Sequence, residues 1–206
     1  MKLYDFPFSP NCRKVRAVAY ELGIALDHEH VDLLTGGSRS PAFLARNPNG
    51  RVPVLEDGDL VLWESTAIIR YLAAGSPLSP VAPRAAAEVD RWIAWQLAHL
   101  APAMSKVAYE NIVKRLTRRG EPDPARIAEG TAEFERLTEI LDAALAGREF
   151  VAGPLTLADF ALAAHYSLAA AAGLSIARHH RVESWLARIS GRDSMKRALH
   201  DAQASL

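Results

Sequence analysis

The stretch YDFPFSPNCRKVRAVAYELGI, residues 4–24, joins a short apolar run to a helical pattern through Ser9-Pro10-Asn11-Cys12. Serine followed by proline is typical of a helix N-cap and the first helical position. Apolar residues then recur at helical spacing as far as Gly23. The stretch therefore predicts a strand, a tight junction and a helix, with the only cysteine of the chain close to the start of that helix.

The rest of the first 76 residues continues this alternation of strand and helix. Residues 26–33 alternate as a second strand, and Ser40 begins a short helix. Asp57-Gly58 is a strong hairpin signal between two strand-like runs, and Ser65 is predicted as the N-cap of a closing helix. The order βαβαββα predicts an α/β domain over residues 1–76.

The second part of the chain has a different character. Residues 76–83 contain three prolines and are typical of a linker, and no strand signal follows them. Helical patterns cover residues 84–118 and 125–146, and the apolar stretch 153–173 is predicted as a buried central helix. Two short amphipathic helices finish the chain, so residues 84–206 are predicted as an all-helical domain.

Composition narrows the class of protein. Half of the 206 residues are apolar and 23% are charged, which is ordinary for a soluble globular protein. The 24 Lys and Arg residues balance 24 Asp and Glu, which argues against nucleic acid as a partner. A single cysteine excludes an internal disulfide and a cysteine-rich metal site, and no apolar run approaches the ~20 residues of a membrane span. Because no charged leader and apolar signal segment precede the first strand, a cytoplasmic protein is expected. No metal is expected as a cofactor.

The junction at Ser9 has two interpretations. Ser9 can simply cap the helix, or its hydroxyl can donate a hydrogen bond to an anion held at the positive helix N-terminus. A thiolate is one such anion, and Asn11 could donate to it as well. Cys12 is predicted to face the sheet, where a small core residue is favoured over an exposed nucleophile.

Two further pairs of residues suggest binding. Pro53 interrupts a strand pattern, and a cis Val52-Pro53 bond would turn the Val52 backbone outward to pair with an extended peptide. An edge-strand proline without a ligand is the alternative. Glu64 can pair with an amine while Ser65 and the helix amides hold a carboxylate, which suits an amino-acid head group. An ordinary capped helix beside a solvated Glu64 explains the same residues.

Other motifs favour structural roles. Thr156 and Asp159 form a capping box that fixes the start of the apolar helix. Trp92, Trp95 and His99 lie along one helix, where they are core residues or the wall of a ligand pocket. No glycine-rich phosphate loop matches the nucleotide-binding fingerprints.

In their order and spacing, four of these features resemble those of a cytosolic glutathione transferase. They are the Ser9-x-x-Cys12 junction, Val52-Pro53, Glu64-Ser65 and the Thr156-x-x-Asp159 box. The resemblance covers essentially the whole chain. The serine places it near the serine-type classes, theta-like or related bacterial ones. The resemblance implies a thioredoxin-like α/β domain that binds glutathione, followed by an all-α C-terminal domain that lines a pocket for electrophiles.

This resemblance implies that Ser9 and Asn11 are the catalytic residues. Ser9 would donate a hydrogen bond to the glutathione sulfur, and Asn11 would assist Ser9. The glutathione-binding residues that it implies are Arg39, Arg51, Val52, Pro53, Glu64 and Ser65. The electrophile pocket that it implies is lined by Trp95, His99 and Pro102. Serine-type relatives often carry a histidine where this chain has Ser38, so the chain departs from their pattern at the glycine end of glutathione. The residues that the resemblance assigns to the glycine carboxylate are Arg39, Arg51 or both.

The resemblance implies a detoxifying homodimer in which glutathione is a substrate and its thiolate attacks small hydrophobic electrophiles. Thioredoxin-like redox proteins carry their nucleophilic cysteine where this chain has Ser9, so the reactive sulfur is expected to come from glutathione. Two alternatives stay open: a glutathione-dependent disulfide or peroxide reductase, and a non-catalytic interaction module of the same fold. A glutathione-dependent isomerase fits less well, because the junction lacks the Ser-Ser-Cys run of that class.

Overall fold

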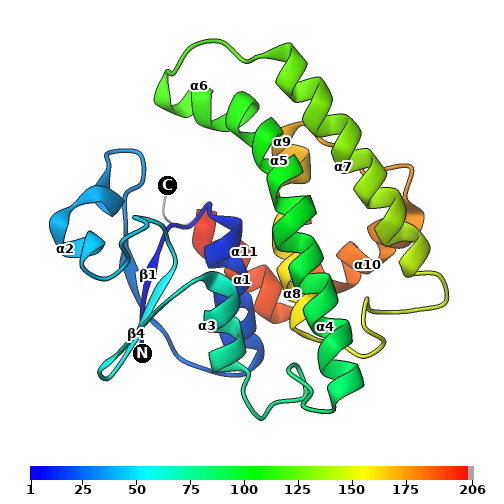
Figure 1. Ribbon diagram of the computed structural model, residues 1–206, viewed down its shortest axis with the longest axis horizontal. Coiled ribbons are helices and arrows are strands. Elements are labelled where there is room, and N and C mark those ends of the chain that lie inside the picture. The colour runs from blue at the N-terminus through cyan, green and yellow to red at the C-terminus, as the bar shows by residue number, and fades with distance from the viewer. Residues whose placement is uncertain (204–206) are drawn as a thin grey trace. The chain divides into compact units, whose positions relative to one another are not determined.

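The computed structural model describes residues 1–203, with side chains described as far as residue 200. The chain forms two compact units. The first comprises residues 1–79 together with the chain from Ser190 onward, and the second comprises Pro80–Ile189. Figure 1 shows the strands and helices of each unit. The last helix of the chain, which the sequence analysis assigned to a helical domain over residues 84–206, thus lies in the same unit as the strands.

A four-stranded sheet forms the centre of the first unit. Its strands are β1 (Lys2–Asp5), β2 (Asp27–His30), β3 (Val54–Asp57) and β4 (Leu60–Trp63), in the order β2-β1-β3-β4. β1 is parallel to β2 and antiparallel to β3, and β3 is antiparallel to β4. Because Asp57 pairs with Leu60, the loop of the predicted hairpin is Gly58-Asp59, and Gly58 has the left-handed φ of 62° that such a turn requires.

Helices cover both faces of this sheet. They are α1 (Pro10–Glu21), α2 (Pro41–Leu44), α3 (Ser65–Leu72) and α11 (Asp193–Gln203), with a 3₁₀ turn at Gly37–Arg39. α1 and α3 lie on one side of the strands and α2 on the other, and α11 packs along α1 (Figure 1). Leu3, Val18, Leu55 and Ile68 are completely buried in this unit. The predicted order βαβαββα is confirmed.

The N-caps predicted at Ser9 and Ser40 are confirmed, but the one predicted at Ser65 is wrong. Glu64 is the N-cap of α3, with a φ of 72° that residues other than glycine seldom adopt. Since β4 ends at Trp63 and α3 begins at Ser65, a single residue must reverse the chain direction. That residue is Glu64, and Ser65 becomes the first residue of the helix.

The second unit consists mainly of helices. They are α4 (Pro83–Trp95), α5 (Ala101–Ala108), α6 (Lys114–Thr117), α7 (Pro124–Ala144), α8 (Leu157–Tyr166), α9 (Ala169–Ala172) and α10 (His180–Ser190). The helical pattern predicted over 84–118 contains two π-helical turns, Gln96–Leu100 and Tyr109–Val113. Such turns are closed by i→i+5 hydrogen bonds and interrupt the regular α-helix.

Helix α8 is the buried centre of this unit, because all ten of its residues are buried. The predicted capping box of Thr156 and Asp159 begins it. The single helix predicted over 153–173 is wrong in its second half, where α8 and α9 are separate. α8 ends where Ser167 Oγ donates to the Ala164 carbonyl at 2.9 Å, a local bond that competes with continuation of the helix.

Candidate functional site

Ser9 ends the loop between β1 and α1. Its backbone is extended, with φ −70° and ψ 122°, and its Oγ accepts a hydrogen bond from the Cys12 N–H at 3.3 Å. The residue is partly exposed. A hydroxyl that accepts through its oxygen keeps its own proton to donate, so the capping bond leaves Ser9 able to act as a donor.

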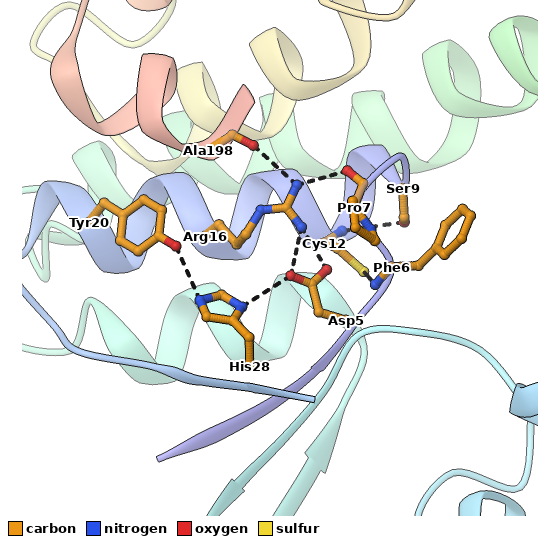
Figure 2. A network of polar contacts seen from close by, with 9 residues as sticks. All are labelled: Asp5, Phe6, Pro7, Ser9, Cys12, Arg16, Tyr20, His28 and Ala198. Carbon is orange, nitrogen blue, oxygen red and sulfur yellow. Dashed lines mark hydrogen bonds and ion pairs between the residues drawn. The ribbon is translucent and has the colours of Figure 1, made fainter. Parts of the chain in front are cut away.

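Cys12 lies in the core behind this loop. Its side chain is fully buried, and Sγ accepts from the Phe6 N–H at 3.5 Å (Figure 2). Burial, reinforced by the nearby Asp5 carboxylate, raises the pKa of Cys12 well above its usual range. The thiol is therefore protonated at neutral pH, and the interpretation of Cys12 as a core residue is confirmed.

Cys12 should resist alkylation in the folded protein. Because only the thiolate reacts and the side chain is fully buried, we expect iodoacetamide at pH 8 to modify it at least ~100-fold more slowly than in the unfolded chain. Intact-mass spectrometry over an hour measures the rate, and the same reaction in guanidinium chloride is the control. Equal rates in the two conditions would show that the thiol is accessible after all.

Asn11 and Ser65 bring the beginnings of α1 and α3 together. Ser65 is buried, and its Oγ donates to Asn11 Oδ1 at 3.2 Å. The exposed Glu64 stands beside this contact, held by the turn between β4 and α3. Two helix N-termini and one carboxylate therefore meet in a small region, which offers amide donors to an anion and an acceptor to an amine.

Lys14 lies beneath the same region, and the sequence analysis missed it. Its side chain is completely buried on α1, and Nζ donates to Thr66 Oγ1 on α3 at 3.3 Å. Burial lowers the pKa of Lys14 to about 8, although the Glu64 carboxylate opposes the shift. A buried cation with one hydrogen-bond partner is costly, because its charge has lost most of its hydration.

Lys14→Met is expected to stabilise the protein at neutral pH. The pKa of Lys14 is lowered in the folded state to about 8. Between this pH and the ordinary pKa of a lysine, the unfolded chain binds more protons than the folded one, so the free energy of unfolding rises with pH. At pH 7 the full penalty applies, and removing the charge should raise the free energy of unfolding by about 3 kcal/mol. Urea unfolding at pH 7 and pH 10 checks this, with Lys106→Met on an exposed ion pair as control. If the difference in free energy of unfolding between wild type and Lys14→Met is as large at pH 10 as at pH 7, the charge of Lys14 is not the cause of the destabilisation.

The Val52-Pro53 peptide bond is cis, which is one of the explanations of Pro53 that the sequence left open. β3 begins at Val54, so Val52 lies just before the sheet pairing starts. Within residues 1–203, the N–H and C=O of Val52 make no hydrogen bond to the chain. The peptide group is therefore able to pair with an extended ligand.

The two arginines assigned to glutathione are exposed and lie near this peptide. Arg39 Nη1 donates to the Asn49 carbonyl at 3.4 Å. The carbonyl of Arg51 accepts from Asn47 Nδ2 at 2.7 Å, and Asn47 itself is buried. Asn47, which the sequence analysis did not single out, thus fixes the backbone on both sides of the turn, since its Oδ1 also accepts from the Asn49 N–H at 3.0 Å.

The residues assigned to the electrophile pocket belong to the second unit. Trp95 ends α4 and packs edge-to-face on the buried Trp92, with ring centroids 5.4 Å apart. His99 lies in the first π-helical turn and Pro102 is the second residue of α5, and both are exposed. Trp92 is thus a core residue, whereas Trp95, His99 and Pro102 present some surface.

Two classes of feature are not found in the part of the chain that the structure describes. No helix there is long and apolar enough to cross a bilayer. No group of three His, Cys, Asp or Glu side chains among these residues is arranged to hold a metal ion.

Comparison with known proteins gives the family. The glutathione S-transferase N-terminal domain model matches residues 3–80. Glutathione S-transferase 3 of Zea mays is 35% identical, across 97% of this chain and 93% of the maize protein. The chain belongs to the glutathione transferase family. It is therefore a glutathione transferase, and the family and enzyme class predicted from the sequence are confirmed.

Solved glutathione transferases share the whole fold. Transferase F7 from Populus trichocarpa superposes with a TM-score of 0.89 at 28% identity, and 98% of each chain is covered. Glutathione S-transferase I, solved with the ligand lactoylglutathione, gives 0.87 at 26% identity over 97% of this chain and 98% of the other. The predicted fold class, a thioredoxin-like α/β part followed by a helical part, is confirmed by this match.

Proposed function

We propose that this transferase joins the thiolate of glutathione to an electrophilic carbon of small apolar compounds, with Ser9 as the donor that stabilises the thiolate. The observation that carries most weight is the Asn11–Ser65 hydrogen bond of 3.2 Å, because it gathers two helix N-termini on the side of Ser9 and Glu64. Such a region favours an anionic ligand with an amino group. A related transferase was solved with lactoylglutathione, a glutathione derivative.

Glutathione would be held along its length by residues 1–76 of the first unit. The free peptide group of Val52 before Pro53 would pair with the cysteinyl residue. Glu64 would bind the γ-glutamyl amine while the backbone N–H of Ser65 and the other amides at the start of α3 bind its carboxylate. The glycine carboxylate would meet Arg39, Arg51 or both.

Bond changes in the reaction are simple. The thiol of glutathione loses its proton to solvent, and the thiolate, hydrogen-bonded by Ser9 with Asn11 nearby, attacks the electrophilic carbon. A carbon–sulfur bond forms, and the leaving group departs with the electron pair of the bond that breaks. Trp95, His99 and Pro102 of the second unit would hold the electrophile, since an apolar ring and a partly exposed helix face suit small hydrophobic compounds.

The same proposal makes the enzyme a cytoplasmic, detoxifying homodimer that needs no metal. The exposed apolar side chains of the edge strand β4, Leu60, Val61 and Trp63, support a second copy as partner. Equal numbers of Lys plus Arg and Asp plus Glu argue against nucleic acid as a partner.

Turnover with an activated aryl chloride, together with calorimetry of glutathione binding, tests the proposed function. We expect glutathione to bind and the thioether to form in proportion to enzyme concentration. Reduction of a dialkyl disulfide at the expense of glutathione, with no thioether from the aryl chloride, would favour the reductase. No heat of binding at millimolar glutathione would favour an interaction module instead.

A further inference from the structure

Arg16 lies at the centre of a buried polar network behind the Ser9 loop (Figure 2). Its side chain is 1% exposed, and Nη1 donates to both carboxylate oxygens of Asp5 at 2.6 Å. Nη2 donates to the Pro7 carbonyl at 2.8 Å and to the Ala198 carbonyl at 3.1 Å. One guanidinium therefore joins the end of β1, the loop before Ser9 and the helix α11.

Asp5 holds this guanidinium in one orientation. Burial raises the pKa of Asp5, but the hydrogen bond from His28 and the charge of Arg16 outweigh it and hold the pKa below its usual range. His28 Nδ1 lies 3.2 Å from Asp5 Oδ2, and its Nε2 lies 3.1 Å from Tyr20 Oη. The Asp5 carboxylate is thus ionised and is hydrogen-bonded by Arg16 from α1 and by His28 from β2. The planar guanidinium of Arg16 therefore has little freedom to rotate.

The loop Phe6–Ser9 is short and fixed at few points. The Ser9 N–H donates to the Phe6 carbonyl at 3.0 Å, and the Phe6 N–H donates to Cys12 Sγ at 3.5 Å. A third hydrogen bond, from Arg16 to the Pro7 carbonyl, is the only one of these that is charge-assisted. Because Pro7 precedes Ser9 by two residues, a displacement of this carbonyl moves the Ser9 hydroxyl.

We propose that Arg16 is a positioning residue for Ser9, and that α11 is part of the support of the thiolate site through the Ala198 carbonyl. This inference rests on the proposed function of Ser9 as thiol donor. A hydrogen bond to a thiolate weakens steeply when donor angle and distance change, so a loosened loop lowers activation without removing the hydroxyl. Arg16 does not touch glutathione in this account and acts only through the loop.

The chain offers a matched control. α11 is attached to α1 a second time at Glu21, which accepts hydrogen bonds from Arg192 Nε at 3.1 Å and from Ser194 Oγ at 2.5 Å. This second attachment joins the same two helices through hydrogen bonds that do not involve the Phe6–Ser9 loop. Glu21→Gln therefore weakens the hold on α11 and leaves the loop as it is.

The experiment compares wild type, Arg16→Lys and Glu21→Gln. Lysine keeps a charge for Asp5 but cannot reach both carbonyls. We expect Arg16→Lys to raise the thiolate midpoint of bound glutathione by about half to one unit. We also expect it to lower kcat by about three- to thirtyfold, within the ~10²-fold that a 1 Å displacement can cause. KM for glutathione should stay within about twofold, and Glu21→Gln should change none of these values despite a lower Tm.

Unchanged midpoint and kcat in Arg16→Lys, or equal changes in Glu21→Gln, overturn the inference. If Arg16→Lys does not fold, Asp5→Asn is measured in its place, since it loosens the guanidinium and keeps the size of the side chain.

Hydrogen exchange separates this inference from the proposed function. The amide protons of Ser9 and Cys12 report on the loop and the N-cap without any substrate. Faster exchange at these two amides in Arg16→Lys than in Glu21→Gln supports the positioning role, even if wild type shows no thiolate and the proposed function fails. Equal exchange in both variants overturns the positioning role, even if wild type proves to be an active transferase.

Discussion

Ser9→Ala is expected to slow conjugation by about ten- to a hundredfold while glutathione affinity stays nearly intact. The size follows from the loss of one hydrogen bond to a charged sulfur, worth about 1.5–3 kcal/mol. Affinity is retained because Val52, Glu64 and Ser65 are proposed to hold the rest of the tripeptide. Steady-state kinetics with glutathione varied at saturating aryl chloride checks both values. Cys12→Ser in the same assay should leave the rate almost unchanged, since the Cys12 thiol is buried.

Ser40→Ala is the matched control for Ser9→Ala. Ser40 caps α2 as Ser9 caps α1: its Oγ accepts from the Phe43 N–H at 3.3 Å, and a proline follows it. Both substitutions remove a cap worth about 1 kcal/mol, so the loss of stability should be similar. Only Ser9→Ala should reduce kcat. Equal kinetic effects, or loss of turnover in Cys12→Ser but not in Ser9→Ala, contradict the role assigned to Ser9.

Ionisation alone explains little of the rate. A free thiol with a pKa of about 8.5 is only ~3% ionised at pH 7, and lowering that pKa by ~2 units raises the thiolate fraction roughly 25-fold. Nucleophilicity falls with pKa at a slope of about 0.5, which removes about tenfold of that gain. The net benefit is a few-fold, so most of the acceleration must come from holding thiolate and electrophile together. A loss near a hundredfold in Ser9→Ala would then mean that the hydroxyl also orients the sulfur.

Asp159→Ala is expected to destabilise the helical unit by about 3–5 kcal/mol, the largest stability effect that we foresee. Its carboxylate is fully buried and accepts from the Thr156 N–H at 2.9 Å, the Val151 N–H at 3.0 Å and Trp185 Nε1 at 3.0 Å. Burial raises the pKa of Asp159 above its usual range, although the hydrogen-bond donors around the carboxylate oppose the shift. Asp159 therefore stabilises the unit through hydrogen bonds and not through an ion pair. Alanine leaves all three donors buried without an acceptor. Urea unfolding measures the change.

Asp123→Ala separates this network from ordinary helix capping. Asp123 caps α7, where its carboxylate accepts from the Ala125 N–H at 2.9 Å. Its loss should cost about 1 kcal/mol, as for a typical N-cap. If Asp159→Ala lowers the free energy of unfolding no more than Asp123→Ala, the buried network does not hold the start of α8 in place.

Features of the fold that depend on neighbouring residues were predictable from the sequence. The strand–helix junction at Ser9, the hairpin at residues 54–63 and the capping box of Thr156 and Asp159 are all set within a few residues. Glu64 was not, because its left-handed backbone arises from the direct succession of β4 and α3. The π-helical turns in residues 84–118 were not predicted either, because the apolar pattern indicates a helix without distinguishing α-helical from π-helical hydrogen bonding.

The candidate site was predictable only in part, because its supporting charges depend on distant partners. Arg16 and Ala198 are 182 residues apart, and no pattern in α1 shows that this arginine is buried. Lys14 meets Thr66 across 52 residues in the same way. The one available signal was the presence of three basic residues, Arg13, Lys14 and Arg16, among the apolar residues of a helix beside a sheet. Together with Asp5 in a strand, they indicate buried ion pairs.

The central claim is that Ser9 stabilises the glutathione thiolate, and the most direct measurement is the ultraviolet difference spectrum of bound glutathione against pH. Thiolate absorbance is followed in wild type and in Ser9→Ala at saturating glutathione. We predict a titration midpoint well below that of free glutathione in wild type, moved upward by about 1 to 2 units in Ser9→Ala. Equal midpoints in the two proteins, or no thiolate signal in wild type, would contradict the account.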